Sequence, residues 1–362
     1  MDIRSEEPHL HLSGEEWNNI ATQLFSDPVA ESAPHRWHRL DQGAGIGNQL
    51  FRVSGTARLP TGVHPWTLVV KLFIIDQAET DPERTRPDGR EYWKREWHVY
   101  RSHWQQHLHG PFRAARCLGS GEFHDSTADV AWIALEDLSS FDQRPWPLPL
   151  FGEVAHHIGA FTGSVIDPPD PPSWLSRHWH LDLIDGVAPA IESLPRLAHH
   201  PLVKRLYPGR VLDDLVMIWE HRYDLLGVQD QLTRALAHND LFPRNIFIRP
   251  TAGASQSIAI DWAYCGVAPI GQELTSLVGS SQVFGECQPT DWDVVEEACV
   301  TGYLAGLRHA GWTGPAGRRP PLRRPTGCPS PVTRRRPASR SSSMSPPPSA
   351  ARSATCRSAT DR

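Results

Sequence analysis

The sequence LAHNDLFPRNIFIRP, residues 236–250, combines apolar side chains that favour burial with polar side chains that need water or a ligand. Its polar members include His238, Asn239, Asp240, Arg244 and Asn245. Burying an unpaired polar group or charge costs free energy, so an acid and two amides are expected here only where they have partners. The segment therefore predicts a loop anchored by apolar residues, with its polar groups facing a shared site.

A β-hairpin is predicted directly after this loop. NIFI at 245–248 and SIAI at 257–260 are short β-branched runs separated by turn-forming residues. If Ile246 pairs with Ile260, the residues just outside this pair stand opposite each other, about 5 Å apart. The pairing would bring two polar residues together at the open end of the hairpin.

Those two residues are Asn245 and Asp261. Amide and carboxylate oxygens are ligands that Mg²⁺ accepts while it keeps water and substrate phosphate. Asp240 lies five residues before Asn245, and a carboxylate beside the metal can accept or orient a hydroxyl proton. The pattern predicts a metal-assisted site with one further carboxylate.

Composition limits the class of protein. The chain has 362 residues, of which 39% are hydrophobic and 21% are charged, as in globular proteins. It has no apolar run of the roughly 20 residues that cross a bilayer, and its N-terminus does not resemble a secretory signal. The six cysteines form no CxxC pair. We therefore expect a cytoplasmic protein with reduced thiols, no zinc site and no membrane partner.

The formal charge of −5 is unevenly distributed. Residues 315–362 contain eleven Arg and one Asp, a net charge of +10, and are rich in Pro and Ser, so we expect a disordered tail. Residues 1–314 carry 25 basic and 40 acidic side chains, a net charge of −15. An acidic body disfavours nucleic acid and is compatible with a cationic small substrate, although solubility explains the charge equally well.

The pattern of elements predicts an α+β protein with two lobes. Residues 1–138 read as a small lobe with a mostly antiparallel sheet and one long helix at 91–107, which carries aromatic residues at helical spacing. Residues 139–314 read as a larger, mainly helical lobe that contains the hairpin. Helices are expected in this lobe at 150–165, 211–226 and 292–311.

The motif His238-x-Asp240-x4-Asn245, followed by Ile260-Asp261-Trp262, resembles the catalytic and metal loops of the protein-kinase-like fold. Within that fold the chain is similar to the aminoglycoside phosphotransferase family over roughly residues 36–312. The resemblance implies a bilobal kinase-like architecture that uses ATP and Mg²⁺.

The resemblance also implies a role for each residue of the motif. Asp240 would be the catalytic base, and Asn245 and Asp261 would bind Mg²⁺. His238 and Glu273 would brace the catalytic loop. An ordinary buried histidine is the plain alternative for His238.

The N-terminal lobe is expected to supply the ATP phosphate contacts. Lys71 ends the strand-like run TLVVK, and Glu96 shares a helix face with Trp93 and Tyr100, so we expect Glu96 to hold Lys71. Glu91 is the alternative partner. Without the other motifs, a solvated lysine at a strand end would be the simpler interpretation of Lys71.

The remaining nucleotide contacts are expected in a glycine loop and a hinge. The loop glycines are Gly43, Gly45 and Gly47. Asn48 follows them, and such a loop lets backbone N–H groups approach phosphate. The segment ALEDL resembles the hinge between the lobes, where backbone groups from Glu136 to Leu138 would bind adenine.

Together these features predict transfer of the ATP γ-phosphoryl group to a hydroxyl of a small molecule, of which an aminoglycoside is the family's namesake. A Ser/Thr protein kinase is disfavoured because Phe242 stands where those enzymes place a lysine. A nucleotide-binding pseudokinase is the other alternative. It is favoured by the basic tail, which replaces the helices that continue the family's acceptor site.

Overall fold

The structure is a computed structural model that describes residue 10 and residues 12–29, 31–40, 48–102, 110–124 and 127–314. The compact unit that contains the described residues ends at residue 316. The predicted tail lies outside the described residues. None of the helices in the described ranges is both long and apolar enough to cross a membrane.

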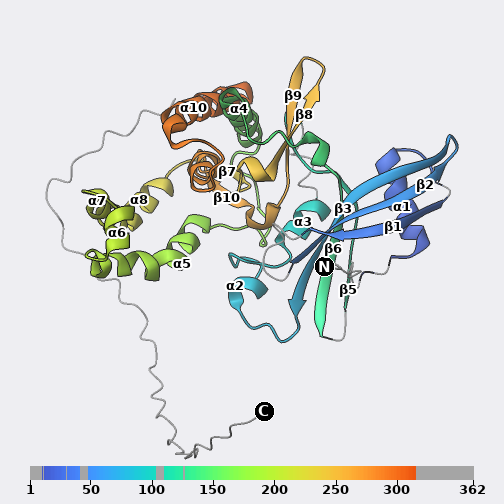
Figure 1. The fold of residues 1–362 in the computed structure, drawn as a ribbon, viewed down its shortest axis with the longest axis horizontal. Coiled ribbons are helices and arrows are strands. Elements are labelled where there is room, and N and C mark those ends of the chain that lie inside the picture. The colour runs from blue at the N-terminus through green and yellow to red at the C-terminus, as the bar shows by residue number, and fades with distance from the viewer. Residues whose placement is uncertain are drawn as a thin grey trace, which may run out of the picture. The chain divides into compact units, whose positions relative to one another are not determined.

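The N-terminal part of the compact unit is built on a five-stranded antiparallel sheet with the order β1-β2-β3-β6-β5 (Figure 1). Its strands are β1 (Glu31–Arg39), β2 (Asn48–Leu59), β3 (Gly62–Asp76), β5 (Cys117–His124) and β6 (Ala128–Glu136). The central strand β3 carries the run TLVVKLFII, which is apolar on both faces because both faces are covered.

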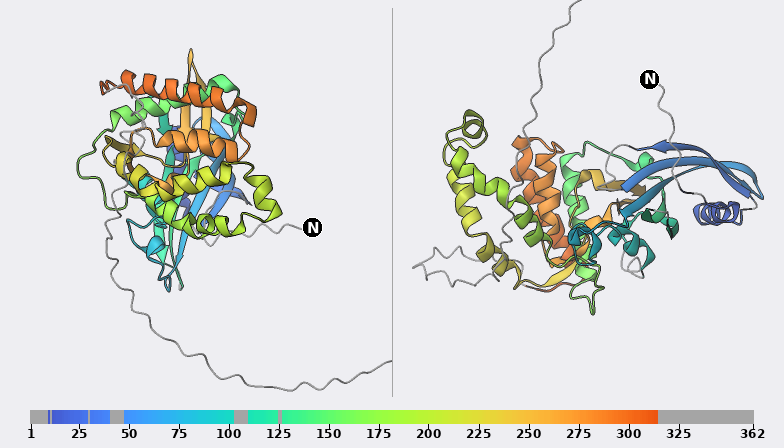
Figure 2. Two further views of the ribbon diagram at one scale, coloured as in Figure 1. Left: turned by 90° about the vertical axis from the view of Figure 1, so that its left-hand side faces the viewer. Right: turned by 90° about the horizontal axis from the view of Figure 1, so that it is seen from below.

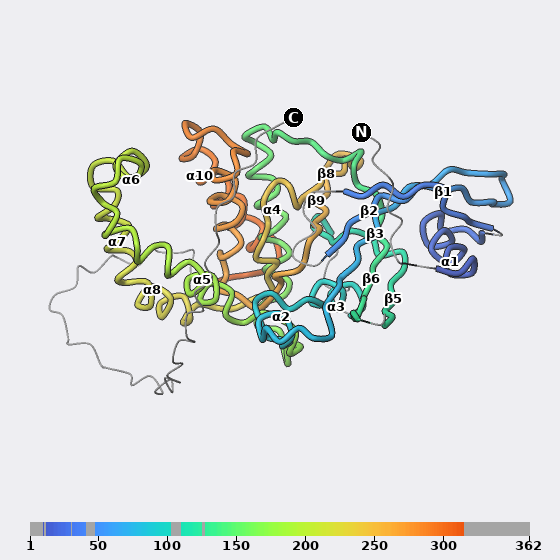
Figure 3. Tube along the Cα trace, turned by 60° about the horizontal axis from the view of Figure 1, so that its bottom comes forward, coloured from blue at the N-terminus to red at the C-terminus, as the bar shows by residue number. Residues whose placement is uncertain are grey.

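One face of the sheet packs against α1 (Gly14–Phe25), which the sequence analysis did not predict (Figure 3). Trp17 and Ile20 of α1 belong to the same buried apolar cluster as the sheet residues Leu68 and Val70. The helix begins at a capping box between Ser13 and Glu16, in which each side chain binds the other residue's backbone N–H. That four-residue pattern was the readable signal for the helix.

The other face packs against α3 (Arg95–Arg101), which follows the short helix α2 (Pro82–Thr85). The predicted helix at 91–107 was too long at its start, since the described helix begins at Arg95 and Trp93 precedes it. Trp97 and Tyr100 are buried with Phe73 of β3, as the aromatic spacing predicted. Residues 103–109 lie outside the described ranges.

The C-terminal part is organised around α4 (Leu148–Ser164) and α10 (Trp292–His309), which lie side by side (Figure 2). These two helices were predicted. Glycines allow the close approach: a Cβ atom at Gly302 would lie 2.1 Å from the carbonyl oxygen of Gly152. At Gly306 a Cβ atom would lie 2.0 Å from the carbonyl oxygen of His156.

Four further helices extend away from this pair (Figures 1 and 3). They are α5 (Trp179–Ser193), α6 (Pro201–Leu206), α7 (Val211–Glu220) and α8 (Arg222–Gln229). The helix predicted at 211–226 is in fact two helices separated at His221. A π-helix (Thr275–Ser280) and α9 (Ser281–Val283) connect the site described below to the segment before α10.

Two small sheets lie between the helices and the large sheet. The strand pair β7 (Arg234–Ala237) and β10 (Gly266–Pro269) is antiparallel. The hairpin of β8 (Ile246–Thr251) and β9 (Ala254–Ala259) gains a third strand, β4 (Phe112–Ala114), parallel to β9. β4 thus belongs to this small sheet, whereas β5, which begins at Cys117, belongs to the large sheet.

The predicted α+β class is confirmed, with an antiparallel sheet in the N-terminal region and a mainly helical C-terminal region. The boundary at residues 138/139 stays a prediction. Residues 1–316 cluster as one unit because core residues from both regions share one apolar cluster, among them Phe73, Trp97, Phe112 and Ile158.

The helix pair makes a stability prediction. Gly306→Ala is expected to destabilise the protein by about 1–3 kcal/mol, because the added methyl group forces α4 and α10 apart. Gly227→Ala is the matched control: it lies in α8 with no atom within 4 Å of the new Cβ, and it should be neutral or stabilising. Urea unfolding measures both, and equal free energies of unfolding for the two variants would contradict the close packing.

Candidate active site

The hairpin presents the predicted metal-binding residues in a register different from the expected one. Ile246 pairs with Ala259, not with Ile260, and the backbone N–H of Ile260 donates to the carbonyl of Asn245 at 3.0 Å. The expectation was wrong by one residue because the strands are joined by a two-residue turn that ends at Gly253, whose φ of +81° suits glycine.

Asp261 therefore lies one residue beyond the position opposite Asn245. It has a left-handed backbone conformation, with φ at 63°. A non-glycine residue in this conformation persists only where its surroundings hold it. Both side chains still line one cleft, so the shift in register changes how the residues are brought together and not whether they meet.

The buried residue Glu273 binds the predicted catalytic loop, residues 238–245. Its carboxylate accepts hydrogen bonds from the backbone N–H groups of His238, at 2.5 Å, and Asn239, at 3.1 Å. Asn239 has a φ of 68°, so the loop makes a left-handed turn at this point. Burial raises the pKa of Glu273 to about 7, while its two N–H donors favour the ionised form.

His238 is fully buried and links the loop to the hairpin. Its Nδ1 accepts the backbone N–H of Asp240 at 3.3 Å, so Nε2 carries the proton donated to the carbonyl of Ile260 at 2.9 Å. Burial lowers its pKa to about 4, which keeps the ring neutral. The contacts are those of a bracing residue, and its ring packs on Trp262.

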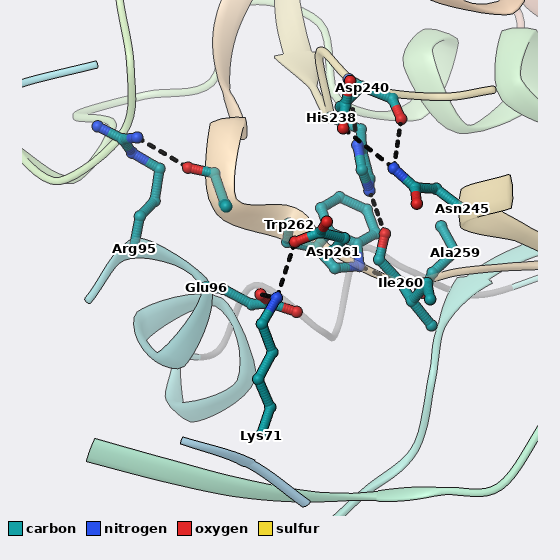
Figure 4. A network of polar contacts seen from close by, with 11 residues as sticks. Lys71, Arg95, Glu96, His238, Asp240, Asn245, Ala259, Ile260, Asp261 and Trp262 are labelled. Carbon is teal, nitrogen blue, oxygen red and sulfur yellow. Dashed lines mark hydrogen bonds and ion pairs between the residues drawn. The ribbon is translucent and has the colours of Figure 1, made fainter. Parts of the chain in front are cut away.

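Asp240 is oriented by Asn245. The Asn245 amide nitrogen donates to both the backbone oxygen and Oδ2 of Asp240, each at 3.0 Å (Figure 4). Burial, together with the nearby charge of Asp261, raises the pKa of Asp240 to about 7. A carboxyl group with this pKa is suited to accept a proton near neutral pH.

Lys71 is buried between two carboxylates. Its Nζ lies 2.5 Å from Oε2 of Glu96 and 2.8 Å from Oδ1 of Asp261 (Figure 4). Burial alone would lower the pKa of Lys71, but the two carboxylates outweigh it and raise the pKa well above its ordinary value. The predicted contact with Glu96 is present. The alternative partner, Glu91, instead pairs with Arg90 at 2.8 Å.

These residues line a cleft of about 500 Å³ between the sheet and the catalytic loop, a size typical of small-molecule sites. Its polar lining includes Lys71, Glu96, Asp240, Asn245 and Asp261. Its apolar lining consists of Leu40, Leu50, Val69, Leu135, Leu138, Phe247 and Ile260, with Phe242 near the catalytic loop. The cleft therefore combines an apolar lining with charged side chains.

The predicted hinge residues lie at the edge of this cleft. Glu136 ends β6, and its carboxylate is occupied by Arg113 and by the backbone N–H of Arg116. The backbone N–H of Glu136 donates to the carbonyl of Arg116, and the carbonyl of Leu138 accepts the N–H of Phe141. Leu138 also lines the cleft. Asn48 is the first residue of β2. The glycines Gly43, Gly45 and Gly47 lie outside the described residues.

Two arginines that line the cleft were not predicted from the sequence. Arg52 pairs with Asp137 at 3.1 Å, and Arg144 pairs with Asp142 at 2.6 Å. Arg244 was predicted to face the site as a polar member of the opening stretch, and it lines the cleft. It pairs with Glu286 at 2.9 Å and lies over the ring of Phe284. Isolated arginines carry no motif, so the sequence held no readable signal for these contacts.

The donor set at the cleft fits a hard cation. The Asn245 amide nitrogen is engaged by Asp240, which leaves its oxygen, and Asp261 contributes carboxylate oxygens. Two protein oxygens beside space for phosphate and water suit Mg²⁺. The described part of the chain holds no cluster of three or more His, Cys, Asp or Glu side chains that would suit zinc.

Comparison with known proteins finds a match to one protein-family model. Residues 162–319 match the model of the phosphotransferase enzyme family. The matched range contains the predicted catalytic loop and the hairpin. The predicted family resemblance is confirmed. The match supports a small-molecule phosphotransferase. No curated protein sequence matches the chain.

The solved structures that match the chain are distant from it in sequence. An aminoglycoside phosphotransferase from Alicyclobacillus acidocaldarius is 13% identical, with 84% of this chain and 80% of that chain covered and a TM-score of 0.49. An amicoumacin kinase in complex with AMP-PNP is 14% identical, with 77% and 73% covered and a TM-score of 0.47. An aminoglycoside phosphotransferase from Streptomyces rimosus, in complex with ADP and streptomycin, is 15% identical, with 76% and 92% covered and a TM-score of 0.40.

The buried charges predict that removal of the Lys71 ammonium group destabilises the protein. Lys71→Met is expected to destabilise the protein by about 3–5 kcal/mol, because it leaves the carboxylate of Glu96 buried without its cation. Lys71→Met combined with Glu96→Gln should recover part of this loss, which a double-mutant cycle in urea measures. Additive effects of the two substitutions would show that the pair is not coupled.

The raised pKa of Asp240 predicts a pH-dependent stability. Because the folded-state pKa is about 7 and the ordinary value is 3.8, the group contributes stability at low pH that is lost as the pH rises to 7. Asp240→Asn should therefore melt at a higher temperature than the wild type at pH 8. The difference should shrink as the pH falls toward 4. Thermal melting between pH 4 and pH 8 checks this, and a difference that does not change with pH would show an unperturbed carboxyl.

Proposed function

We propose that this protein is an ATP-dependent O-phosphotransferase that transfers the γ-phosphoryl group of Mg-ATP to a hydroxyl group of a small molecule. One observation carries the proposal: the ammonium group of Lys71, held by Glu96 and Asp261, lines the same cleft as Asp240 and Asn245. Phosphoryl transfer needs a fixed cation for the phosphates, oxygen ligands for Mg²⁺ and a carboxylate that positions the acceptor.

The lining of the cleft suits both the base and the phosphates of a nucleotide. Val69, Leu135 and Leu138 form an apolar surface on which a planar base can pack, and the end of β6 offers backbone groups at its edge. Lys71 lies two residues further along β3 than Val69 and lines the same cleft. A nucleotide whose base packs on these apolar residues would place its phosphates toward Lys71 and Asp261.

The chain's own residues would supply the rest of the mechanism. Asn245 and Asp261 would hold Mg²⁺, which when bound neutralises charge on the phosphates. Asn245 also fixes the carboxylate of Asp240, so that its remaining oxygen can accept the proton of an incoming hydroxyl. The pKa of Asp240, raised to about 7 by burial, makes this carboxylate a stronger base than an exposed one.

The proposed acceptor is a small molecule that carries a hydroxyl group. An aminoglycoside is the first acceptor to test, because it is the namesake of the family and because the net charge of −15 on residues 1–314 suits a polycation. Phe242, two residues after Asp240, lies 5.3 Å from Phe284 by ring centroids. Phe242 lines the cleft, where its ring would pack on an acceptor held near Asp240.

The proposal makes a prediction that separates binding from transfer. Mg-ATP at 100 times its dissociation constant should stabilise the full chain by roughly 2.7 kcal/mol. Asp240→Ala should keep this stabilisation but lose phosphate transfer to a panel of aminoglycosides and other hydroxylated acceptors. Asp261→Ala should lose the stabilisation itself, because it removes a metal ligand.

Thermal melting and a phosphate-transfer assay measure the two effects. Asp224→Ala, an exposed acid on α8, is the control and should change neither readout. Binding of Mg-ATP without transfer by the wild type to any acceptor would favour the pseudokinase alternative. Transfer that survives Asp240→Ala would contradict the assigned base.

A further inference from the structure

Arg95 is buried beside the proposed phosphate site but does not line the cleft. It is the first residue of α3 and directly precedes Glu96, and none of its surface is exposed. A buried guanidinium is costly unless its five N–H donors find acceptors. Arginine remains protonated in proteins, so it cannot avoid this cost by losing its charge.

All five donors of Arg95 can be matched to backbone carbonyls. Nε donates to Trp174 at 2.8 Å, and Nη1 donates to Arg90 at 2.9 Å and to Ala263 at 2.8 Å. Nη2 donates to Gly89 and, at 3.4 Å, to Pro87. Five hydrogen bonds from one side chain are thus directed at the backbone.

These carbonyls come from three segments that are far apart in the sequence. Residues 87–90 lead into α3, Trp174 lies in the segment after α4, and Ala263 lies two residues after Asp261. Arg95 therefore connects the helix that carries Glu96 to the loop that carries the proposed metal ligand. The planar fork of arginine can hold several acceptors at fixed spacing, which the single ammonium point of lysine cannot.

The neighbouring residue holds the same loop from a second direction. Glu96 accepts a hydrogen bond from the backbone N–H of Trp262, in addition to its contact with Lys71 (Figure 4). Residues 95 and 96 thus bind the backbone on the C-terminal side of Asp261 at two successive positions. Asp261 itself is in the left-handed conformation, which needs such support from its surroundings.

The helix itself is too short to set its own position. α3 has seven residues and no side-chain hydrogen bond at its N-cap, and isolated helices of this length are unstable in water. Its place is fixed by Trp97 and Tyr100 in the core and, at its first turn, by Arg95.

We propose that Arg95 is a positioning residue that clamps α3 to the metal-binding loop, and so sets the direction in which Asp261 faces the bound cation. The proposal rests on the proposed function, because it concerns the same Mg²⁺-nucleotide site. Arg95 acts through Asp261 and Glu96 and does not contact the nucleotide. Residues that orient a metal ligand typically change metal affinity about 10–100-fold when they are replaced.

The test is the effect of Mg²⁺ on nucleotide affinity in the full chain. The dissociation constant of AMP-PNP is measured by calorimetry with and without MgCl₂. The constant without MgCl₂ divided by the constant with MgCl₂ reports the metal site. In Arg95→Lys this ratio should fall by about 10-fold or more, while affinity without Mg²⁺ stays as in the wild type. A purely structural role would lower the melting temperature and leave the ratio unchanged in the folded protein.

A second variant perturbs the clamp without changing Arg95. A Cβ atom on Gly89 would lie 2.5 Å from the carbonyl oxygen of Glu83, so Gly89→Ala must shift the segment that supplies three of the five carbonyls. It should lower the ratio in the same direction. This variant decides the question if Arg95→Lys does not fold.

Two controls match the two substitutions. Arg222→Lys replaces an arginine on α8 that donates to the carbonyl of Trp219, away from the cleft, and Gly14→Ala adds a methyl group where no atom lies within 4 Å. Both should keep the wild-type ratio. If Arg95→Lys folds and keeps the wild-type ratio, the proposal is overturned. If Arg95→Lys does not fold, a wild-type ratio in Gly89→Ala overturns it. No effect of Mg²⁺ on the wild type itself would instead refute the proposed function, and the role of Arg95 with it.

Discussion

The buried ammonium group of Lys71 is the interaction on which the arrangement of the site depends. It lies between the carboxylates of Glu96 and Asp261, which belong to a helix of the N-terminal region and to a loop of the C-terminal region. Two carboxylates near each other in a desolvated place repel unless a cation lies between them. The lysine therefore stabilises the approach of the two regions on either side of the cleft.

The rest of the site is organised so that polar atoms near this charge are satisfied. Glu273 accepts two backbone N–H groups of the catalytic loop, and His238 bridges that loop to the end of the hairpin. Trp262 is completely buried and packs on the ring of His238. Apolar packing thus fixes the backbone, and the backbone in turn aims Asp240 and Asp261 into the cleft.

Burial also gives the site its electrostatic character. The same desolvation that raises the pKa of Asp240 to about 7 lowers that of His238 to about 4, since burial disfavours whichever form is charged. The histidine is therefore held neutral as a structural link, while the aspartate becomes a group that can exchange a proton near neutral pH. One physical effect separates the roles of two residues that stand two positions apart.

The sequence by itself determined the local parts of this protein. The spacing of His238, Asp240 and Asn245 before a β-branched run was sufficient to predict the loop, the hairpin and the polar site, because turns and strand periodicity are properties of neighbouring residues. The stripe of apolar residues in 292–311 likewise predicted α10. The contact of Lys71 with Glu96 was predicted from the helix face, aided by the family resemblance.

Only the tertiary structure decided how distant segments meet. The addition of β4 to the hairpin, the one-residue difference in the register of Ile246, and the five carbonyls around Arg95 join segments far apart in the chain. Such pairings are selected by the packing of the whole core, which a local pattern does not encode. The pKa of Asp240 has the same origin, because desolvation depends on which residues from elsewhere in the chain cover the carboxylate.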